Sequence, residues 1–223
     1  MINRIIIFIT LILFTCSSSL FAFDTGNKLK YFNAGYGRSS DLSSSHVDWN
    51  PSMLYNATWM HATFNNMWTG TMGFNYEYFI LNFLTVGGAI NVEYTHYNVK
   101  IPHYDMFSGG TAYRDDNFNI ISLTTPIGLR FYINNILIGG GVYYSLNTVK
   151  FMNLDLENMK ANNSYGLYAD IGLYTDTVYN YHHYMIFVRY RHGLNTAVSQ
   201  DGYDFEATKL RAFTVYLASG SSY

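Results

Sequence analysis

The chain has 223 residues and a formal net charge of −2, with 49% hydrophobic, 18% aromatic and only 13% charged residues. An ordinary soluble domain carries about 25% charged residues, so this chain has too few charges for the surface of such a domain. The single cysteine, Cys16, excludes an internal disulfide, and the length suits one β domain.

The N-terminus has the three parts of a secretory signal peptide. Arg4 supplies positive charge, a largely apolar run extends from Ile5 to Phe14, and Ala22 is the small residue before a cleavage site. We therefore predict a signal peptide over residues 1–22 and a single domain over residues 23–223. The apolar run is too short for a transmembrane helix, which needs about 20 residues. The alternative is lipoprotein processing at Cys16.

No later segment resembles a transmembrane helix, and alternating stretches typical of β-strands follow instead. The clearest are two long runs joined by Asn134-Asn135, a dipeptide that suits the positive φ values of a tight hairpin turn. Each run reaches the roughly 9–11 residues that a tilted strand needs to cross a bilayer. Eight strands are predicted, over residues 29–37, 71–80, 84–99, 118–133, 136–150, 164–175, 184–196 and 208–218.

The connections between these strands alternate in length. Short ones cover residues 81–83, 134–135 and 176–183, and longer polar ones cover residues 38–70, 100–117, 151–163 and 197–207. Short periplasmic turns and long extracellular loops are typical of outer-membrane barrels. We therefore predict an all-β fold, an eight-stranded antiparallel up-and-down transmembrane β-barrel; a further hairpin over residues 53–64 would give ten strands. Pro126, inside the fourth strand, predicts a bulge or an irregular ladder.

Charged residues within the strands fall on the face opposite the apolar one. In the sixth strand Leu167 and Ile171 share one face, and Asp170 lies on the other. A barrel in lipid turns its apolar face outward, so the charges are expected inside and paired, because a lone buried charge is costly. The predicted lumenal ion-pair network comprises Glu77, Glu93, Arg130, Asp170, Arg189 and Arg191. We interpret this network as a polar plug in a lumen too narrow for a free aqueous channel, with a gate or a proton path as the alternative.

Basic residues also mark the strand ends. Arg38, Lys100 and Lys150 follow the first, third and fifth strands, and this rim suits contact with anionic lipid head-groups; solvated strand ends are the alternative. Lys209 and Arg211 share the parity of outward apolar residues, which predicts a bulge in the last strand or a position above the membrane. Tyr and Phe near the strand ends are typical of the aromatic girdles at membrane interfaces.

Several stretches resemble the small outer-membrane β-barrel superfamily, the OmpA/OmpX- and opacity-type "porin family" proteins. They are Gly73–Phe79, Pro126–Tyr132, Gly139–Tyr144 and, similar to the penultimate strand of the family, Val188–Gly193. The resemblance implies a barrel in the bacterial outer membrane without a catalytic signature. It also implies that the assembly machinery of that membrane reads the C-terminal aromatic residue, here Tyr223.

Residue types of barrel enzymes occur in one loop, as His103, Asp105 and Ser108, and at the end of the seventh strand, as His192. Catalysis requires a base within hydrogen-bond reach of its nucleophile, which this pattern does not indicate, so no enzyme is expected. A metal at His182-His183 is not expected either, because adjacent strand residues point to opposite faces. No cofactor is predicted.

The predicted role is structural or surface-interactive: envelope integrity, adhesion or host contact through the extracellular loops. The expected partners are outer-membrane lipids, the outer-membrane assembly machinery and a host or surface ligand, with no nucleic acid. A narrow solute pore is the main alternative, and a lipid-A-modifying enzyme follows it. A soluble lipocalin-like barrel would reverse the parity and turn the apolar residues inward.

Overall fold

The computed structural model describes residues 26–39, 63–105, 110–151, 159–177, 182–196, 198–200 and 209–223. At several strand ends, including residues 63–67, 97–105, 110–118 and 149–151, it describes the backbone only. The predicted signal peptide lies outside the described residues. In the part of the chain that is described, no helix has the length and hydropathy to cross a membrane.

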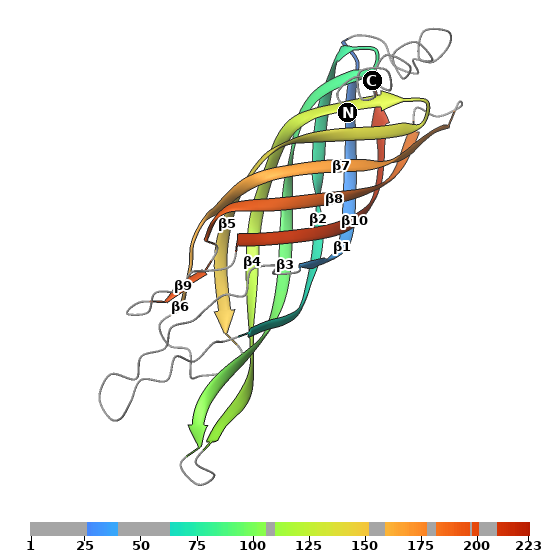
Figure 1. Cartoon of the computed structure of the whole chain (residues 1–223). Helices are drawn as coiled ribbons and strands as arrows, with labels where there is room; N and C mark the ends of the chain where they lie inside the picture. Colours follow the sequence, from blue (N-terminus) through green and yellow to red (C-terminus); the bar gives the residue numbers. More distant parts are fainter. Residues whose placement is uncertain are drawn as a thin grey trace, which may run out of the picture.

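Eight antiparallel strands form a closed barrel in the order β1-β10-β8-β7-β5-β4-β3-β2 (Figure 1). They are β1 (Lys28–Ser39), β2 (Thr63–Leu81), β3 (Leu84–Asp105), β4 (Gly110–Ile133), β5 (Ile136–Phe151), β7 (Ser164–Thr177), β8 (His182–Thr196) and β10 (Lys209–Ser222). The short strands β6 (Met159–Ala161) and β9 (Val198–Gln200) form a separate two-stranded sheet. The prediction of an eight-stranded up-and-down barrel is therefore confirmed.

The ten-strand alternative is wrong, because β1 pairs directly with β2 and no further strand enters the barrel between them. Residues 53–62 of the proposed extra hairpin lie outside the described residues. The longest difference from the predicted strands is in the β3–β4 hairpin, whose pairing continues to Asp105 and Gly110. Within the described residues, positions 101–105 pair with β4 alone, so this hairpin extends beyond the described barrel wall (Figure 1).

The strands are staggered by ten residues where the barrel closes. In one direction around the barrel, Arg38 of β1 pairs with Trp68 of β2, and the row of paired residues continues through His96 of β3 and Asn119 of β4. This row reaches β5 at Lys150. The opposite path leads to Gly140 on β5 through Phe213, Tyr190 and Ala169. The difference is 150 − 140 = 10 residues. With a rise of about 3.3 Å per residue and strands about 4.8 Å apart, this stagger corresponds to a tilt of about 40°, as in small closed barrels.

Two local predictions concern the β4 strand. Asn134 and Asn135 have φ values of 46° and 68°, which confirms the tight turn between β4 and β5. At Pro126 the β3–β4 ladder passes from the pair Gly88–Ile127 to the pair Asn91–Thr124 without a change of register. The two intervening positions are unpaired because proline has no N–H to donate. The irregular ladder is confirmed, and the irregularity is an interruption without a bulge.

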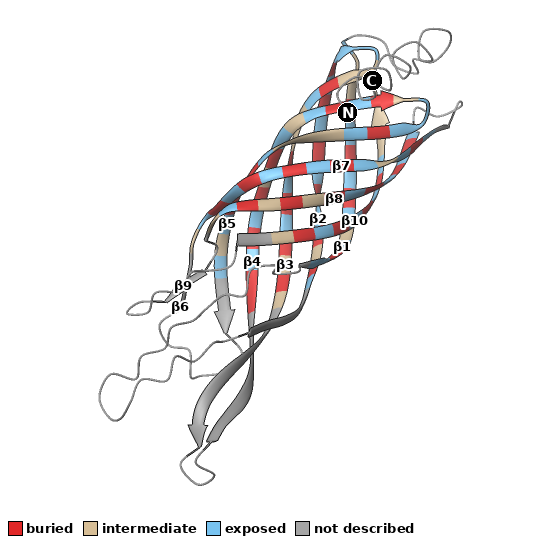
Figure 2. Cartoon of the chain, in the orientation of Figure 1, coloured by how far each residue is buried: buried red, intermediate tan, exposed pale blue. Residues whose placement is uncertain are grey.

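Burial alternates along every strand of the barrel wall (Figure 2). Phe74, Ile171 and Leu217 are 71%, 61% and 63% exposed, whereas Asp170 is 2% exposed. The apolar face therefore points outward and the polar face fills the lumen, as lipid requires. This parity contradicts the soluble-barrel alternative.

The apolar outer face differs in height around the barrel. On β1 it is bounded by the outward residues Lys30 and Arg38, whereas on β4 it continues from Ile121 to Ile133. At about 3.3 Å per residue and a tilt of about 40°, these stretches rise by about 20 Å and about 30 Å. The usual apolar band of an outer-membrane barrel is about 25 Å tall.

The short turns and both described termini lie at one end of the barrel, the periplasmic end in the usual orientation (Figure 1). Apolar and aromatic side chains close the lumen at this end. We call them the periplasmic plug. Its members are Leu29, Tyr31, Phe79, Tyr132, Leu137, Tyr174, Met185, Phe187, Tyr216 and Ala218. All are at most 6% exposed, so this end of the barrel is packed like a protein core.

Candidate functional site

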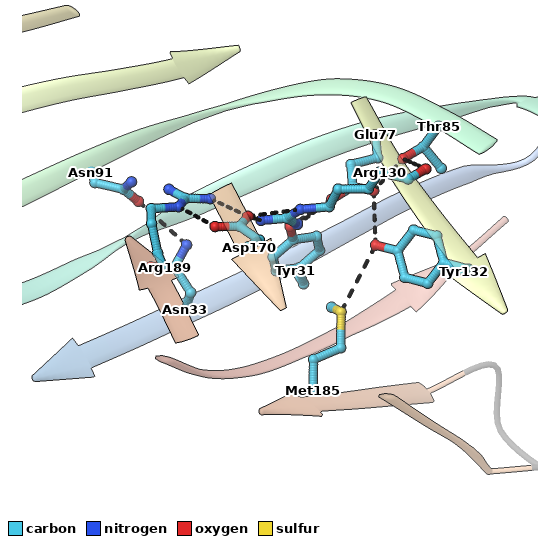
Figure 3. Close-up of polar contacts among 10 residues, drawn as sticks. All are labelled: Tyr31, Asn33, Glu77, Thr85, Asn91, Arg130, Tyr132, Asp170, Met185 and Arg189. Atoms are coloured by element: carbon cyan, nitrogen blue, oxygen red, sulfur yellow. Dashed lines mark hydrogen bonds and ion pairs between the residues drawn. The ribbon is translucent and has the colours of Figure 1, made fainter. Parts of the chain in front are cut away.

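Four charged residues meet in the middle of the lumen, and we call them the central cluster: Glu77 of β2, Arg130 of β4, Asp170 of β7 and Arg189 of β8 (Figure 3). Their formal charges sum to zero. The barrel register brings three of them together, because Asp170 is paired with Arg189 on one side and with Gly139 on the other. Arg130 is paired with that same glycine, so its side chain crosses β5 to reach Asp170.

The glycine at this crossing is required for space. A Cβ atom on Gly139 would lie 2.5 Å from Cγ of Arg130, well inside van der Waals contact. A Cβ atom on Gly128 would likewise lie 2.5 Å from the hydroxyl oxygen of Tyr168. The inward glycines of β4 and β5 therefore make room for the long lumenal side chains of their neighbours.

Asp170 is the shared acceptor of the two guanidinium groups. Arg189 donates from Nε to Oδ1 at 2.7 Å and from Nη2 to Oδ2 at 2.8 Å. Arg130 donates from Nη2 and Nε to Oδ2 at 2.7 and 3.1 Å. Four charge-assisted hydrogen bonds thus satisfy one carboxylate that is fully enclosed by protein.

Glu77 is satisfied by a different set of donors. Arg130 donates from Nη1 to Oε1, and the hydroxyl of Tyr31 donates to the same oxygen at 2.6 Å. Oε2 accepts from the hydroxyls of Tyr132 at 2.8 Å and Thr85 at 2.7 Å (Figure 3). Arg130 therefore bridges the two carboxylates, and the tyrosines link the central cluster to the periplasmic plug.

Aromatic rings enclose the guanidinium groups of the central cluster. Cζ of Arg189 lies 4.4 Å from the ring centroid of Tyr168 and 5.2 Å from that of Tyr216. Cζ of Arg130 lies 4.9 Å from the ring centroid of Phe187. These cation–π contacts add to the attraction that holds the two guanidinium groups in place.

Glu93 and Arg191 form a second ion pair nearer the loop end, which we call the outer pair. Nη1 of Arg191 donates to Oε2 of Glu93 at 2.6 Å. The other carboxylate oxygen and Nε of Arg191 are buried and make no hydrogen bond within the described structure. A cavity of about 20 Å³ adjoins both residues, enough for about one water molecule.

Small cavities adjoin the ionic groups of the described lumen. A second cavity, of about 10 Å³, adjoins the central cluster at Glu77, Arg130 and Arg189, again about the size of one water. The periplasmic plug lies beyond it. Side chains therefore fill the barrel from the central cluster to the turn end.

The structure places all six predicted lumenal residues inside the barrel, each at most 8% exposed, but divides them into the central cluster and the outer pair. No ion pair among the described residues joins the two groups. Sequence reasoning missed Tyr31, Thr85 and Tyr132 as donors to Glu77. Their inward parity is readable from the strand pattern, but the choice of acceptor depends on the register.

The predicted basic rim lies at the loop end of the barrel. Arg38 is exposed on the outer face of β1. Lys150 belongs to the same row of paired residues, and Lys100 pairs with Asp115 of β4 farther along the hairpin; their side chains are outside the described part. In β10 a register shift falls between Lys209 and Arg211. The predicted bulge is therefore present next to Lys209, whereas Arg211 keeps the outward parity of Phe213.

The candidate enzymatic and metal-binding histidines are not assembled into a described site. His103 and Asp105 lie where only the backbone of β3 is described, and Ser108 is outside the described residues. His182 is exposed, whereas His183 is buried with Nε2 2.8 Å from Oγ of Ser222. The described residues contain no group of three metal-ligating side chains.

Comparison with known proteins gives matches among solved structures only. No protein-family model and no curated protein matches the sequence. The outer membrane protein OprG from Pseudomonas aeruginosa has a TM-score of 0.63 at 14% identity, over 92% of this chain and 99% of that one. AlkL has a TM-score of 0.48 at 17% identity, over 92% and 93% of the two chains. Ail of Yersinia pestis has a TM-score of 0.41 at 13% identity, over 90% and 100%.

The likeness to OprG shows the fold, which is that of the small outer-membrane β-barrels. The described strands close without an edge and turn their apolar residues outward. Only such closed structures satisfy every backbone group of a sheet in lipid. The chain is therefore an integral β-barrel of the bacterial outer membrane.

Proposed function

We propose that the protein is a closed outer-membrane barrel whose role is structural and surface-interactive, with the loop end as its working surface. The observation that carries this proposal is the filled lumen: the buried side chains of the central cluster and the periplasmic plug occupy the barrel interior, and the cavities beside the ionic groups measure about 10 and 20 Å³. In a barrel of eight strands, side chains are sufficient to fill the interior. The lumen then serves as a rigid core that holds the wall and its loops in place.

The energetics of the central cluster support a closed state. A passage through the barrel would have to separate Arg130 or Arg189 from Asp170, and removing one partner of a buried pair costs about 3–5 kcal/mol. The aromatic residues of the periplasmic plug would also have to move. Thermal fluctuation supplies about 0.6 kcal/mol, so the closed arrangement dominates.

The proposed working surface is the loop end, where the β3–β4 hairpin rises above the barrel. Its backbone is paired to Asp105 and Gly110, which gives a two-stranded support for contact with a host or surface ligand. The basic rim of Arg38, Lys100 and Lys150 would meet lipid head-groups below it. The assembly machinery of the outer membrane is the further proposed partner, through the C-terminal Tyr223.

Conductance in planar bilayers tests the closed lumen. We expect no single-channel steps at a protein load at which a general porin conducts, because no aqueous path crosses the central cluster. The narrow solute pore is the second candidate, supported by the cavity and the unsatisfied polar atoms at Glu93 and Arg191. Reproducible steps whose size changes in Glu93→Gln would support the pore and reject the closed barrel.

Labelling of intact cells tests the orientation. The predicted mature chain has no cysteine, so single cysteines can be introduced at Thr111 in the β3–β4 hairpin and, as the matched control, at Asn135 in the β4–β5 turn. A membrane-impermeant maleimide should label the first variant and spare the second. Labelling of the Asn135 variant alone would reverse the proposed orientation and reject the loop end as the external surface.

A further inference from the structure

Three nitrogen-bearing side chains lie together on the outer face of the barrel at its loop end. Arg38 of β1, Arg211 of β10 and His192 of β8 have the outward parity of their strands. Arg211 is paired directly with His192, and Arg38 is paired with Phe213, two residues from Arg211. Directly opposite residues are about 5 Å apart and diagonal ones about 7–8 Å. Arg211 therefore lies between the other two residues, and one anion beside Arg211 could contact all three groups.

These three groups have no described acidic partner. The ion pairs of the described residues lie in the lumen. Their nearest outward neighbours on the same strands carry no charge: Tyr36 of β1, Phe213 of β10, and Tyr190 and Leu194 of β8. The positive charge of the two guanidinium groups is therefore uncompensated on this face, within the part of the chain that the structure describes.

Aromatic residues lie beside the three groups and on their membrane side, and we call them the aromatic floor: Tyr36, Trp68, Tyr190 and Phe213. The rings of Tyr190 and Phe213 lie 4.7 Å apart, directly beside His192 and Arg211 in the strands. The rings of Tyr36 and Trp68 lie 6.3 Å apart and are nearly parallel, next to Arg38. Tyr and Trp side chains concentrate at the membrane–water interface, so this floor marks the level of the lipid head-groups.

We propose that Arg38, Arg211 and His192 bind a phosphate group of a phosphorylated glycolipid in the outer leaflet. The planar guanidinium fork matches two phosphate oxygens, and the imidazole supplies a further N–H donor. The acyl chains of the same lipid lie along the outward apolar residues below, Val215 and Leu217, which are 47% and 63% exposed. The inference rests on the proposed lipid contact and is independent of the closed lumen.

The opposite rim of the same strand provides a matched control. Lys30 is also an outward base of β1, but its Nζ lies 4.5 Å from the ring centroid of Tyr223 and 5.9 Å from that of Tyr76. Its ammonium is therefore engaged by aromatic rings at the periplasmic level. Replacing Lys30 removes one outward charge without touching the proposed phosphate site.

The test is native mass spectrometry of the full barrel in detergent, titrated with diphosphorylated lipid A and with its dephosphorylated form. The double variant Arg38→Gln/Arg211→Gln should bind diphosphorylated lipid A about 30-fold more weakly, from about five-fold for each base near a lipid surface. Arg38→Gln alone should lose about five-fold, and Lys30→Gln should bind as the native chain does. Heat-modifiable migration on gels checks that each variant is folded.

Three results would overturn the proposal. The first is equal affinity of the native chain for the two lipid forms. The second is an affinity that does not change in the folded Arg38→Gln and Arg38→Gln/Arg211→Gln variants. The third is a loss of affinity in Lys30→Gln as large as that in Arg38→Gln. Competition by inorganic phosphate separates the lipid from a free anion. If tens of millimolar phosphate displaces the lipid completely, the site recognises free phosphate, and the assignment to a lipid is wrong. A conductance measurement has no bearing on any of these outcomes.

Discussion

The sharpest test of the lumenal arrangement is Asp170→Asn, which keeps the size of the side chain and removes one charge. In the native chain Glu77 and Asp170 balance Arg130 and Arg189, so the central cluster has charge 2 − 2 = 0. The variant leaves two guanidinium groups and one carboxylate, a net charge of +1 in a buried space. The amide nitrogen of the new asparagine would also face the N–H donors of Arg130 and Arg189, where it finds no acceptor.

The magnitude follows from what is broken. Asp170 accepts four hydrogen bonds from two arginines, and its side chain is fully buried. Breaking one partner of a buried ion pair costs about 3–5 kcal/mol, so we expect a loss of this size in the free energy of unfolding. The assay is urea-induced unfolding in lipid vesicles, followed by tryptophan fluorescence.

A charge-balanced variant separates electrostatics from packing. Asp170→Asn/Arg189→Gln returns the cluster to zero charge, with Glu77 and Arg130 remaining paired. We expect this double variant to recover at least half of the stability that Asp170→Asn loses, because the uncompensated charge is removed. A loss below about 1 kcal/mol in the single variant, or a double variant less stable than the single one, would refute the reasoning.

Three further predictions concern the wall and its ends. Gly139→Ala should lower the urea midpoint by the equivalent of about 1–3 kcal/mol, because its Cβ would strike Arg130. Gly70→Ala should not, because its Cβ would make only an ordinary contact, 3.9 Å from the ring of Trp68; equal effects would contradict the crossing at Gly139. Ile171→Arg should destabilise the folded barrel by about 2–4 kcal/mol in vesicles, and an unchanged free energy of unfolding would place Ile171 outside lipid. Tyr223→Ala removes the ring beneath Lys30 and should cost about 0.5–1 kcal/mol, measured by the same unfolding; an unaltered value would mean that this contact has no energetic role.

The strand parity could be predicted from the sequence because a lipid environment imposes it strictly. Ile171 must face acyl chains, so its neighbour Asp170 can only face inward, and a period of two follows along the strand. The same rule explains what was missed in the β3–β4 hairpin. Above the membrane both faces of a strand contact water, so residues 100–105 and 110–117 need no apolar alternation and resemble a loop in sequence.

The partners within the lumen could not be predicted, because they depend on the stagger of the whole barrel. Arg130 reaches Asp170 only because Gly139 lies between them in the register. Nothing local in the sequence of β4 fixes that alignment; it is set by the ten-residue offset on closure. The same dependence explains why six charged residues of correct parity divide into the central cluster and the outer pair.

The unequal height of the apolar outer face has a consequence for the surrounding lipid. Next to β1 only about 20 Å separates Lys30 from Arg38 along the normal, whereas β4 offers about 30 Å of apolar surface. A bilayer of uniform thickness cannot match both sides, so it must compress beside β1 or the cylinder must lean toward it, each at fractions of a kcal/mol per Å. Because β1 and β10 form the seam between the first and last strands, the bilayer would be thinnest where the barrel closes.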